Sequence, residues 1–379
     1  MHYQHVCLES LGYALPEEVI TSDEIECRLE PLYRRLRLPE GRLELMSGIR
    51  ERRLWPRGAR PSDGSIESGR RALAAAGVDP GEIGCLIHGS VCRDQLEPAT
   101  ACRVHDALDL PEACLVYDVS NACLGLLNGM VQIANLIEQG QIRAGLVVGT
   151  EDSRALLEGT IDALNRDESL TRDRIKSAFA SLTIGSASAA ALLVHNDLSR
   201  TGNRLCAVAA RAHTKHYALC QGDHAADVDG AAQMLMQTDS ERLLQEGLNT
   251  GVATFADFLA ASGWSREQIH KTICHQITGT HRRMMLESLG LTVERDYATF
   301  PWLGNTGSVA LPITLALAVE TGFIQSQEHV ALLGIGSGIN SLMLAVDWQR
   351  TLTAERGIDM RPHFATRLAE QNTTAKVTN

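Results

Sequence analysis

Residues 118–125, Asp118-Val119-Ser120-Asn121-Ala122-Cys123-Leu124-Gly125, place a cysteine where a strand-like stretch gives way to a helical pattern. Residues 114–119 favour a β-strand, and the apolar side chains of residues 124–137 recur at helical spacing. Unpaired N–H groups at a helix N-terminus carry about half a positive charge, which favours a thiolate over a thiol. We therefore expect this position to lower the pKa of Cys123 and to make it a nucleophile. The alternative is a small buried cysteine that packs beneath the strand end.

Strands and helices alternate on both sides of this stretch, as is typical of α/β folds. Residues 83–88 and 144–148 are predicted to be buried strands, and a helix is predicted near residues 99–108. Similar segments recur about 185 residues further along the chain: residues 84–88 and 271–275, residues 145–149 and 330–334, and residues 123–126 and 308–311. The recurrence predicts an internal duplication, in which two copies of one α/β unit pack around a pseudo-twofold axis.

The duplication divides the chain into two halves and a tail. The first half, residues 1–196, carries the nucleophile and ends with a buried strand predicted over residues 183–194. The second half spans residues 197–349. The charged insertion over residues 154–176 favours helices and is expected to cover the surface or an active-site entrance. Residues 350–379 form a polar tail that we expect to be partly disordered.

The composition excludes several classes of function. The 379 residues suffice for two cores, and the formal net charge of −11 argues against general binding of nucleic acid or anionic membranes, because the protein's field repels polyphosphate. The N-terminus does not resemble a signal peptide, and the longest apolar stretch, residues 309–319, is too short to span a bilayer. The ten cysteines lack the paired spacing of zinc sites and disulfide frameworks. Reduced thiols and a cytoplasmic location are therefore expected.

Two residues of the second half are candidate partners for Cys123. His275 follows the strand-like residues 272–274, and Asn305 lies in a glycine-lined turn over residues 303–308, which opens an apolar helix. Glycines beside a polar residue let a ligand approach the main chain. Each residue also has a structural alternative, since a histidine after a strand is often a satisfied core residue and an asparagine beside glycine is a turn signal. A duplicated fold brings such strand-to-helix junctions together.

Taken together, these three residues make the sequence similar to the thiolase superfamily, in its β-ketoacyl-ACP synthase III branch. The similarity extends to about residue 348, and its further matches are residues 47–53, residues 144–150 and residues 334–338. It implies an α/β fold of the thiolase type, with the duplicated halves in five layers, α-β-α-β-α. It also implies a catalytic triad of Cys123, His275 and Asn305, and an oxyanion hole formed by the backbone N–H groups of Cys123 and Ser337.

Within this branch, three segments most resemble the OleA-type enzymes that condense two fatty acyl-CoA molecules: residues 96–101, residues 121–124 and residues 332–340. Joining two such thioesters requires removal of an α-proton, and a carboxylate whose pKa is raised by desolvation can act as the base. The resemblance implies that Glu97 is this base, and that it reaches the active site of the partner subunit in a homodimer. Without the resemblance, a glutamate before a proline is usually a solvated turn residue.

The resemblance also indicates the ligands. It implies acyl-CoA thioesters as substrates, with acyl carrier protein as the alternative carrier, and no cofactor beyond coenzyme A as part of the substrate. Arg42 falls where many ketoacyl synthases stack an aromatic ring on the adenine, and a guanidinium can stack there instead. Arg50 and Arg282 are further candidates for binding the anionic carrier. His281 could form a metal pair with His275, but no carboxylate or cysteine spacing supports one, so no metal site is expected.

Three functions remain open at this point. In the leading one, Cys123 takes an acyl group from a coenzyme A thioester, Glu97 deprotonates a second thioester, and Claisen condensation followed by hydrolysis yields a β-keto acid. The rival is a 3-oxoacyl-ACP synthase III or a secondary-metabolite ketosynthase, in which loss of carbon dioxide from a malonyl extender generates the enolate without a strong base. The third is a non-catalytic scaffold, against which the intact triad counts. One departure from the family leaves a turn geometry open, because residues 184–188 replace its usual Gly-Asp-Gly.

Overall fold

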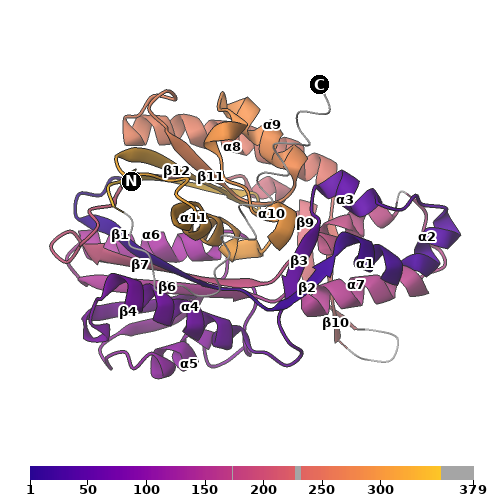
Figure 1. Cartoon of the computed structure of the whole chain (residues 1–379), viewed down its shortest axis with the longest axis horizontal. Helices are drawn as coiled ribbons and strands as arrows, with labels where there is room; N and C mark the ends of the chain where they lie inside the picture. The colour runs from indigo at the N-terminus through magenta and orange to yellow at the C-terminus, as the bar shows by residue number, and fades with distance from the viewer. Residues whose placement is uncertain (173, 227–231, 351–379) are drawn as a thin grey trace.

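Helices and sheets alternate in five layers in the computed structural model (Figure 1). The structure describes residues 1–172, 174–226 and 232–350. The tail predicted over residues 350–379 therefore lies outside the described residues, apart from its first residue.

The first half is built on strands in the order β5-β4-β6-β7-β1. Its elements are β1 (Val6–Ala14), β4 (Ile83–Gly89), β5 (Leu115–Val119), β6 (Ala144–Glu151), β7 (Ala187–His195), α4 (Pro61–Ala76), α5 (Thr100–Ala107) and α6 (Gly125–Glu138). The helices α4 and α5 cover the outer face of these strands, and α6 covers the inner face (Figure 1). The strand predicted over residues 183–194 begins later, at Ala187, because the preceding residues form a turn at the active site.

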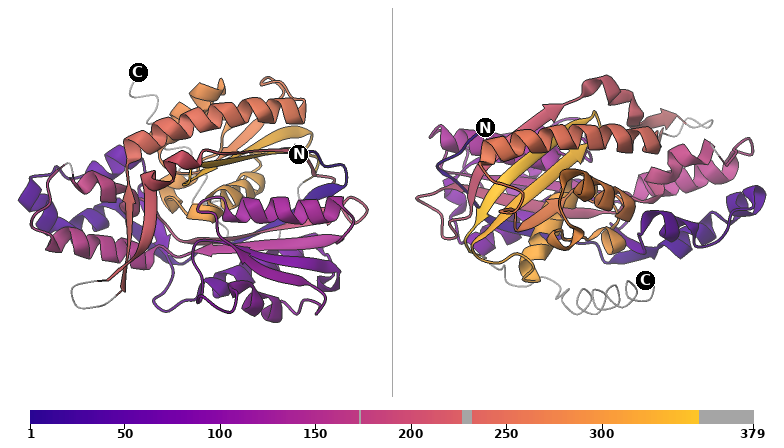
Figure 2. Two further views of the ribbon diagram at one scale, coloured as in Figure 1. Left: turned by 180° about the vertical axis from the view of Figure 1, so that it is seen from behind. Right: turned by 90° about the horizontal axis from the view of Figure 1, so that it is seen from above.

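The second half repeats this arrangement, which confirms the predicted duplication. Its strands have the order β11-β12-β13-β8, with the same parallel and antiparallel pairings as β4-β6-β7-β1. Its elements are β8 (Arg204–Ala212), β11 (Lys271–Cys274), β12 (Glu328–Gly336), β13 (Asn340–Trp348), α8 (Ser240–Ser262), α9 (Gly279–Leu289) and α11 (Ala310–Glu320). Seen from above, α8 runs across the outer face of these strands (Figure 2).

The layers are held together by a central apolar core between the two half-sheets. The helices α6 and α11 fill this space, and every residue of α11 except Glu320 is buried, as expected for a helix that is apolar all round. The half-sheets join into one nine-stranded sheet where β1 meets β8, at the paired position of Cys7 with Arg204. The five-layer α/β arrangement expected from the resemblance is therefore confirmed.

A close approach of two glycines places the start of α6 against the end of β4. A Cβ atom added at Gly89 would lie 2.7 Å from the carbonyl oxygen of Gly125, so only glycine allows this contact. The contact positions the turn that precedes α6, in which Cys123 lies.

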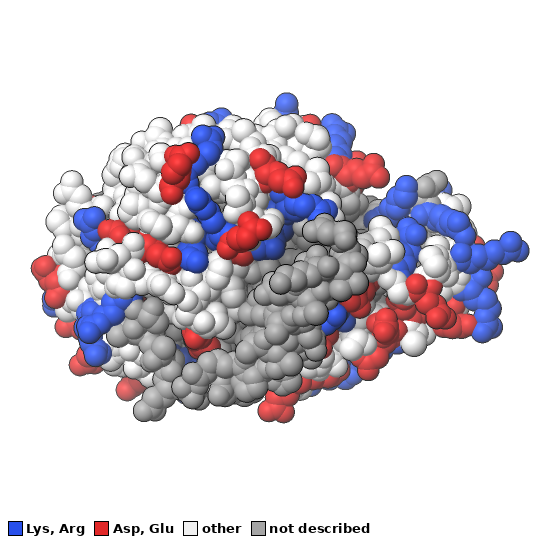
Figure 3. Space-filling model, turned by 45° about the horizontal axis from the view of Figure 1, so that its top comes forward, with Lys and Arg blue, Asp and Glu red and all other residues white. Residues whose placement is uncertain are grey.

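A lobe with its own apolar core extends from one end of the layers, at the right of Figure 1. It consists of β2 (Glu18–Thr21), β3 (Glu51–Leu54), α1 (Ser22–Arg28), α2 (Glu30–Leu36), α3 (Arg42–Ser47), α7 (Arg154–Arg166) and the 3₁₀ segment η2 (Arg174–Leu182). The predicted insertion over residues 154–176 thus forms α7 and the start of η2. Figure 3 shows Lys and Arg side chains at this end of the molecule, where α2 and the residue that follows it expose Arg34 and Arg37.

The remaining elements are short: η1 (Pro80–Glu82), η3 (Thr214–Leu219), η4 (Val293–Arg295), η5 (Gly307–Val309), α10 (Phe300–Leu303) and the hairpin of β9 (Cys220–Ala226) and β10 (Ala232–Thr238). In the part of the chain that the structure describes, no helix is both long and apolar enough to cross a membrane.

Candidate active site

A cavity of about 440 Å³ lies between the two halves and brings the predicted triad together. Cys123 comes from the turn before α6, His275 from the end of β11, and Asn305 from the loop between α10 and η5. Ser337, expected in the oxyanion hole, lies in the same wall, between β12 and β13. Four segments separated in the sequence thus contribute these residues to one space.

Cys123 is held in a tight turn rather than in the first turn of the helix. Leu124 is the N-cap of α6, and its N–H donates to the carbonyl oxygen of Asn121 at 2.9 Å. Ala122 has a φ of +44°, a left-handed conformation that costs energy for a residue other than glycine. Such strain is typical of positions where the backbone aims a reactive side chain.

The expectation that the helix N-terminus lowers the pKa of Cys123 is wrong. Burial, with smaller contributions from the nearby Cys220 and Glu151, raises the pKa of this thiol to about 12. Cys123 lies one residue before the N-cap, and desolvation of the thiolate outweighs any stabilisation that the helix provides. The free protein therefore holds a neutral thiol, which must lose its proton when it attacks.

His275 is a neutral partner for this thiol. It is 3% exposed, and among the described residues neither ring nitrogen has a hydrogen-bond partner. Burial, with a smaller contribution from His281, lowers its pKa to about 3, so the ring is uncharged at neutral pH. A neutral imidazole can accept a proton at one nitrogen and donate from the other. Gln276 fixes the backbone beside it, since its side chain donates to the carbonyl oxygen of Cys274 at 2.8 Å and accepts from the N–H of Thr299 at 3.0 Å.

Asn305 is oriented by its own turn. Its Oδ1 accepts a hydrogen bond from the N–H of Gly307 at 3.0 Å, which leaves the amide nitrogen as the donor for a ligand carbonyl. The backbone of Asn305 donates to the carbonyl oxygen of Thr183 at 2.9 Å and accepts from the N–H of Gly185 at 2.9 Å. These bonds define the turn whose geometry the sequence left open. A Cβ atom at Gly185 would lie 1.9 Å from the carbonyl oxygen of Leu303, so this contact requires glycine.

The loop that carries Ser337 is tied to the turn that carries Cys123. The Nδ2 of Asn340 donates to Oδ1 of Asn121 at 3.2 Å and to the carbonyl oxygen of Ser337 at 3.3 Å. A Cβ atom added at Gly336 would lie 3.5 Å from both the Cβ and the backbone nitrogen of Cys123, so the two backbones run side by side. The segment that carries Ser337 is therefore in contact with the turn that carries Cys123.

Glu151 is a functional residue that the sequence analysis missed. It ends β6, is 6% exposed, and lines the cavity. One carboxylate oxygen accepts from Ser308 Oγ at 2.5 Å and from the N–H of Val91 at 3.1 Å, and the other accepts from the N–H of Cys92 at 3.3 Å. Glu151 thus joins the loop after β4 to the loop that carries Asn305. An acidic residue at the end of a buried, largely apolar strand was the available signal.

Comparison with known proteins agrees with this geometry. The chain matches the family models of the thiolase N-terminal domain over residues 57–228 and of the 3-oxoacyl-[acyl-carrier-protein] synthase III C terminal over residues 259–348. It is 41% identical, over 351 residues, to the acyl-CoA:acyl-CoA alkyltransferase of Shewanella oneidensis, an alignment that covers 92% of this chain and 100% of the relative. It is 33% identical, over 348 residues, to the protein of the same name from Xanthomonas campestris, with coverage of 92% and 100%.

A solved structure gives the same result. The crystal structure of a Cys-to-Ser variant of Xanthomonas campestris OleA with bound lauric acid and lauroyl-CoA superimposes with a TM-score of 0.85, at 33% identity, and covers 91% of this chain and 100% of that one. The chain belongs to the OleA family of the thiolase superfamily. It is therefore an acyltransferase with a ketoacyl synthase III-like fold.

Glu97, the base expected in an OleA-type enzyme, lies outside the cavity of its own chain. It is exposed on the loop between β4 and α5, and its peptide bond to Pro98 is cis. The same loop begins at the cavity, because Val91 and Cys92 line it. The loop therefore leads from the active site of its own subunit out to the protein surface.

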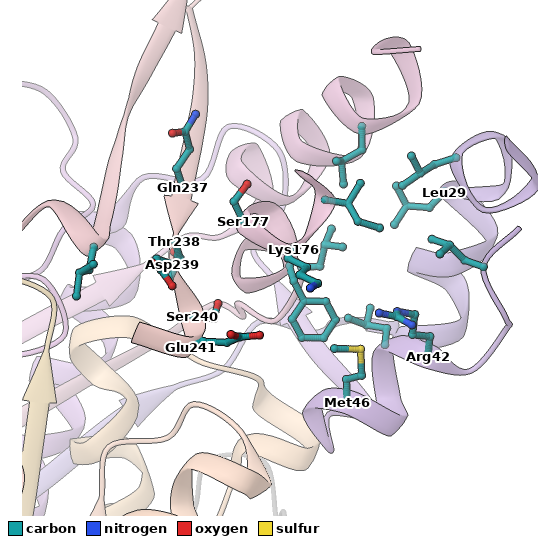
Figure 4. A pocket seen from close by; sticks show the side chains of 18 of the residues that line it. Leu29, Arg42, Met46, Lys176, Ser177, Gln237, Thr238, Asp239, Ser240 and Glu241 are labelled. Atoms are coloured by element: carbon teal, nitrogen blue, oxygen red, sulfur yellow. The ribbon is translucent and has the colours of Figure 1, made fainter. Parts of the chain in front are cut away.

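Of the residues expected to bind coenzyme A, Arg42 lines a second cavity of about 610 Å³, which shares Thr238 and Ser240 with the first. Figure 4 shows that Arg42 of α3 and Lys176 of η2 both extend into this space. Its lining also includes apolar side chains such as Leu29 and the acidic residues Asp239 and Glu241.

The other two arginines lie outside both cavities. Arg50 is exposed and pairs with Glu44 at 3.3 Å. Arg282 donates from Nε to Oδ2 of the buried Asp296 at 2.6 Å and from a terminal nitrogen to the carbonyl oxygen of Val293 at 2.8 Å. Arg282 therefore braces the start of α9 against the segment that follows it, and the expectation that it contacts coenzyme A is not supported.

Proposed function

We propose that the protein joins two fatty acyl-CoA molecules by a non-decarboxylative Claisen condensation through an acyl group on Cys123. The observation that carries the proposal is the single cavity that gathers Cys123, His275 and Asn305 at the contact of the two halves. The names of the relatives at 41% and 33% identity support acyl-CoA as both substrates. The malonyl-dependent alternative is not favoured by these relatives.

In the first half-reaction, Sγ of Cys123 attacks the thioester carbonyl while its proton passes to His275. The tetrahedral oxyanion is stabilised by the N–H groups of Cys123 and Ser337. The intermediate then expels the coenzyme A thiolate, which takes up the proton and leaves as the thiol. The acyl group is now bound to Cys123 as a thioester.

In the second half-reaction, the carboxylate of Glu97 removes a proton from the α-carbon of another acyl-CoA. The imidazole of His275 and the amide of Asn305 donate to the thioester oxygen, where the negative charge of the enolate develops. The enolate carbon attacks the Cys123 thioester, a carbon–carbon bond forms, and the Cys123 thiolate leaves and takes up a proton, which restores the thiol, while Glu97 gives up the α-proton to water. Hydrolysis of the β-keto acyl-CoA then releases coenzyme A and the β-keto acid.

We propose that Glu97 acts in the cavity of a second subunit, so that the active unit is a homodimer. Glu97 is exposed in its own chain, and its neighbour Leu96 is 91% exposed, which is unusual for a large apolar side chain. The strand β5 closes the order of the described sheet at this side, so one of its edges offers backbone groups to another strand. A partner docked there would desolvate Glu97 and make it a stronger base.

We propose that the second cavity admits the coenzyme A portion of the substrates. Its cationic residues Arg42 and Lys176 suit phosphate groups, and the junction at Thr238 and Ser240 leads toward Cys123. No cofactor beyond coenzyme A is needed for this chemistry. All ten cysteines are free thiols, which fits a reducing, cytoplasmic location.

The proposal is tested by supplying lauroyl-CoA as the sole substrate and identifying the product by mass spectrometry. We expect a β-keto acid built from two lauroyl chains, without any malonyl thioester. The Glu97→Gln variant should lose at least about 100-fold in condensation, since general-base catalysis contributes roughly that much or more. The control Glu112→Gln changes another exposed glutamate and should retain activity. A requirement for malonyl thioester, or full activity in Glu97→Gln, would contradict the proposal.

A further inference from the structure

Away from the active-site cavity, three potential metal ligands converge where β8 meets α8. His213 follows β8, His216 lies in η3, and Glu246 lies on α8. Their ligand atoms all lie within 4.8 Å of one another. The rings of the two histidines meet edge to face, with their centroids 4.7 Å apart.

The contact of His216 with Glu246 does not have the geometry of a hydrogen bond. His216 is 7% exposed, and its Nε2 is buried without a hydrogen-bond partner among the described residues. This nitrogen lies 3.3 Å from Oε2 of Glu246, yet not in line for a hydrogen bond. Two ligands of a tetrahedral zinc ion, each at about 2.0–2.1 Å from the metal, stand about 3.3 Å apart. The spacing of Nε2 of His216 and Oε2 of Glu246 is therefore that of two ligands bound to one zinc ion.

The tautomer of His213 is fixed in a way that suits a ligand. The hydroxyl of Thr250 donates to the carbonyl oxygen of Glu246 at 2.8 Å, so its proton is already used. In its 3.2 Å contact with Nδ1 of His213, the hydroxyl must therefore accept, and a neutral ring carries its proton on Nδ1. This leaves the lone pair on Nε2. A hydrogen bond that fixes the second ring nitrogen is typical of metal-binding histidines.

We propose that His213, His216 and Glu246 bind a divalent transition metal ion of the zinc class. Two imidazoles and one carboxylate form a donor set that suits Zn²⁺, with a fourth position left for water. None of the three residues lines the active-site cavity. An ion held by these residues would connect η3 to α8 outside the active site.

The proposed clamp is linked to the wall of the active site through the backbone. The N–H of His213 donates to the carbonyl oxygen of Ile339 at 2.7 Å, and Ile339 lines the cavity two residues after Ser337. The sequence-based expectation of no metal site considered only cysteine pairs and the pair of His275 with His281. It missed this cluster because Glu246 is distant in sequence and only folding brings it to the histidines.

The test is a metal titration of the untagged, chelator-treated protein, with Zn²⁺ in competition with a chromophoric chelator and with Co²⁺ as a spectroscopic probe. We expect one ion per chain whose binding depends on this cluster, with visible Co²⁺ bands of a four- or five-coordinate site that lack thiolate charge transfer. His216→Gln should weaken this binding at least about 100-fold, and Thr250→Val, which removes only the orienting hydroxyl, about tenfold. Zn²⁺ should raise the unfolding temperature of the wild type but not of His216→Gln.

The matched control replaces another pair of neighbouring histidines, His5 and His195, whose rings stack 5.3 Å apart. The double variant His5→Gln/His195→Gln should bind Zn²⁺ as the wild type does. Circular dichroism of metal-free His216→Gln should match that of the metal-free wild type, which separates loss of a ligand from loss of folding. Equal Zn²⁺ affinity in the wild type and His216→Gln, or no Zn²⁺ bound by the wild type, would overturn the proposal and leave an ordinary polar cluster.

Discussion

At the scale of residues, Cys123 and His275 line one cavity as a neutral thiol and a neutral imidazole. Burial disfavours the charged form of each, raising the pKa of one to about 12 and lowering that of the other to about 3. A resting thiolate–imidazolium pair would place two charges in a largely enclosed site, where their desolvation costs several kcal/mol per ion. Proton transfer is therefore coupled to attack on a substrate, and the free protein is protected from unproductive alkylation.

The neutral resting thiol predicts how the alkylation rate of Cys123 depends on pH. Because the thiolate fraction grows about tenfold per pH unit below the pKa, the rate at which iodoacetamide alkylates Cys123 in the free protein should rise steadily from about pH 7 to pH 10 without a plateau. Peptide mass spectrometry of the Cys123 peptide measures this rate, and the Cys123→Ala variant identifies the peptide. A plateau below about pH 9 would indicate a stabilised thiolate and would contradict the neutral resting state.

At the scale of elements, the active site depends on loops that are fastened to one another. Glu151, at the end of β6, connects two of these loops. It accepts hydrogen bonds from the loop after β4, which carries Glu97, and from Ser308, which closely follows Asn305 in the sequence. The proposed base and the proposed enolate-binding group are thus positioned from one carboxylate. This makes Glu151 a positioning residue for the second half-reaction.

The variant Glu151→Gln tests this role. It removes the charge and one acceptor oxygen, so we expect a loss of about 1–3 kcal/mol in the free energy of unfolding, because buried donors lose their partner. Condensation should fall more than acylation of Cys123, a split that a purely structural effect would not produce. Denaturant unfolding and separate assays of the two half-reactions measure these effects. Ser308→Ala, which removes a single donor, is the milder control, and equal losses in both half-reactions would argue against positioning.

The sequence predicted the elements around the site better than it predicted the chemical state of the site. Apolar periodicity and the repeated segments were sufficient for the duplicated halves, because each copy buries the same faces. The grouping of Cys123, His275 and Asn305 followed from the resemblance. The pKa of Cys123 could not be predicted, because it depends on burial and on the charges of Cys220 and Glu151, which only the folded chain brings near.

At the scale of the whole molecule, the proposed mechanism requires two subunits for one reaction. Glu97 lies at the surface of its own chain, whereas Cys123 lies in the cavity between the halves. This division predicts complementation between two inactive variants. In a mixed dimer of Glu97→Gln and Cys123→Ala subunits, one of the two sites combines an intact Cys123 with an intact Glu97 from the partner.

Co-refolded or co-expressed mixtures of these variants should therefore regain condensation, up to roughly a quarter of the wild-type rate if subunits combine at random and dimers are the rule. Each variant alone should stay inactive, and analytical ultracentrifugation should show the dimer in all three samples. No recovery in a sample that contains mixed dimers would show that Glu97 acts within its own chain or not at all.

The central claim, that Cys123 carries the acyl group, is tested most directly by the mass of the intact protein after brief incubation with lauroyl-CoA and rapid quenching. We expect the wild type to gain one lauroyl group, and Cys102→Ala, which removes an exposed cysteine of α5, to gain the same mass. Cys123→Ala should gain none. An unmodified wild type, or a lauroyl group retained in Cys123→Ala, would contradict the account.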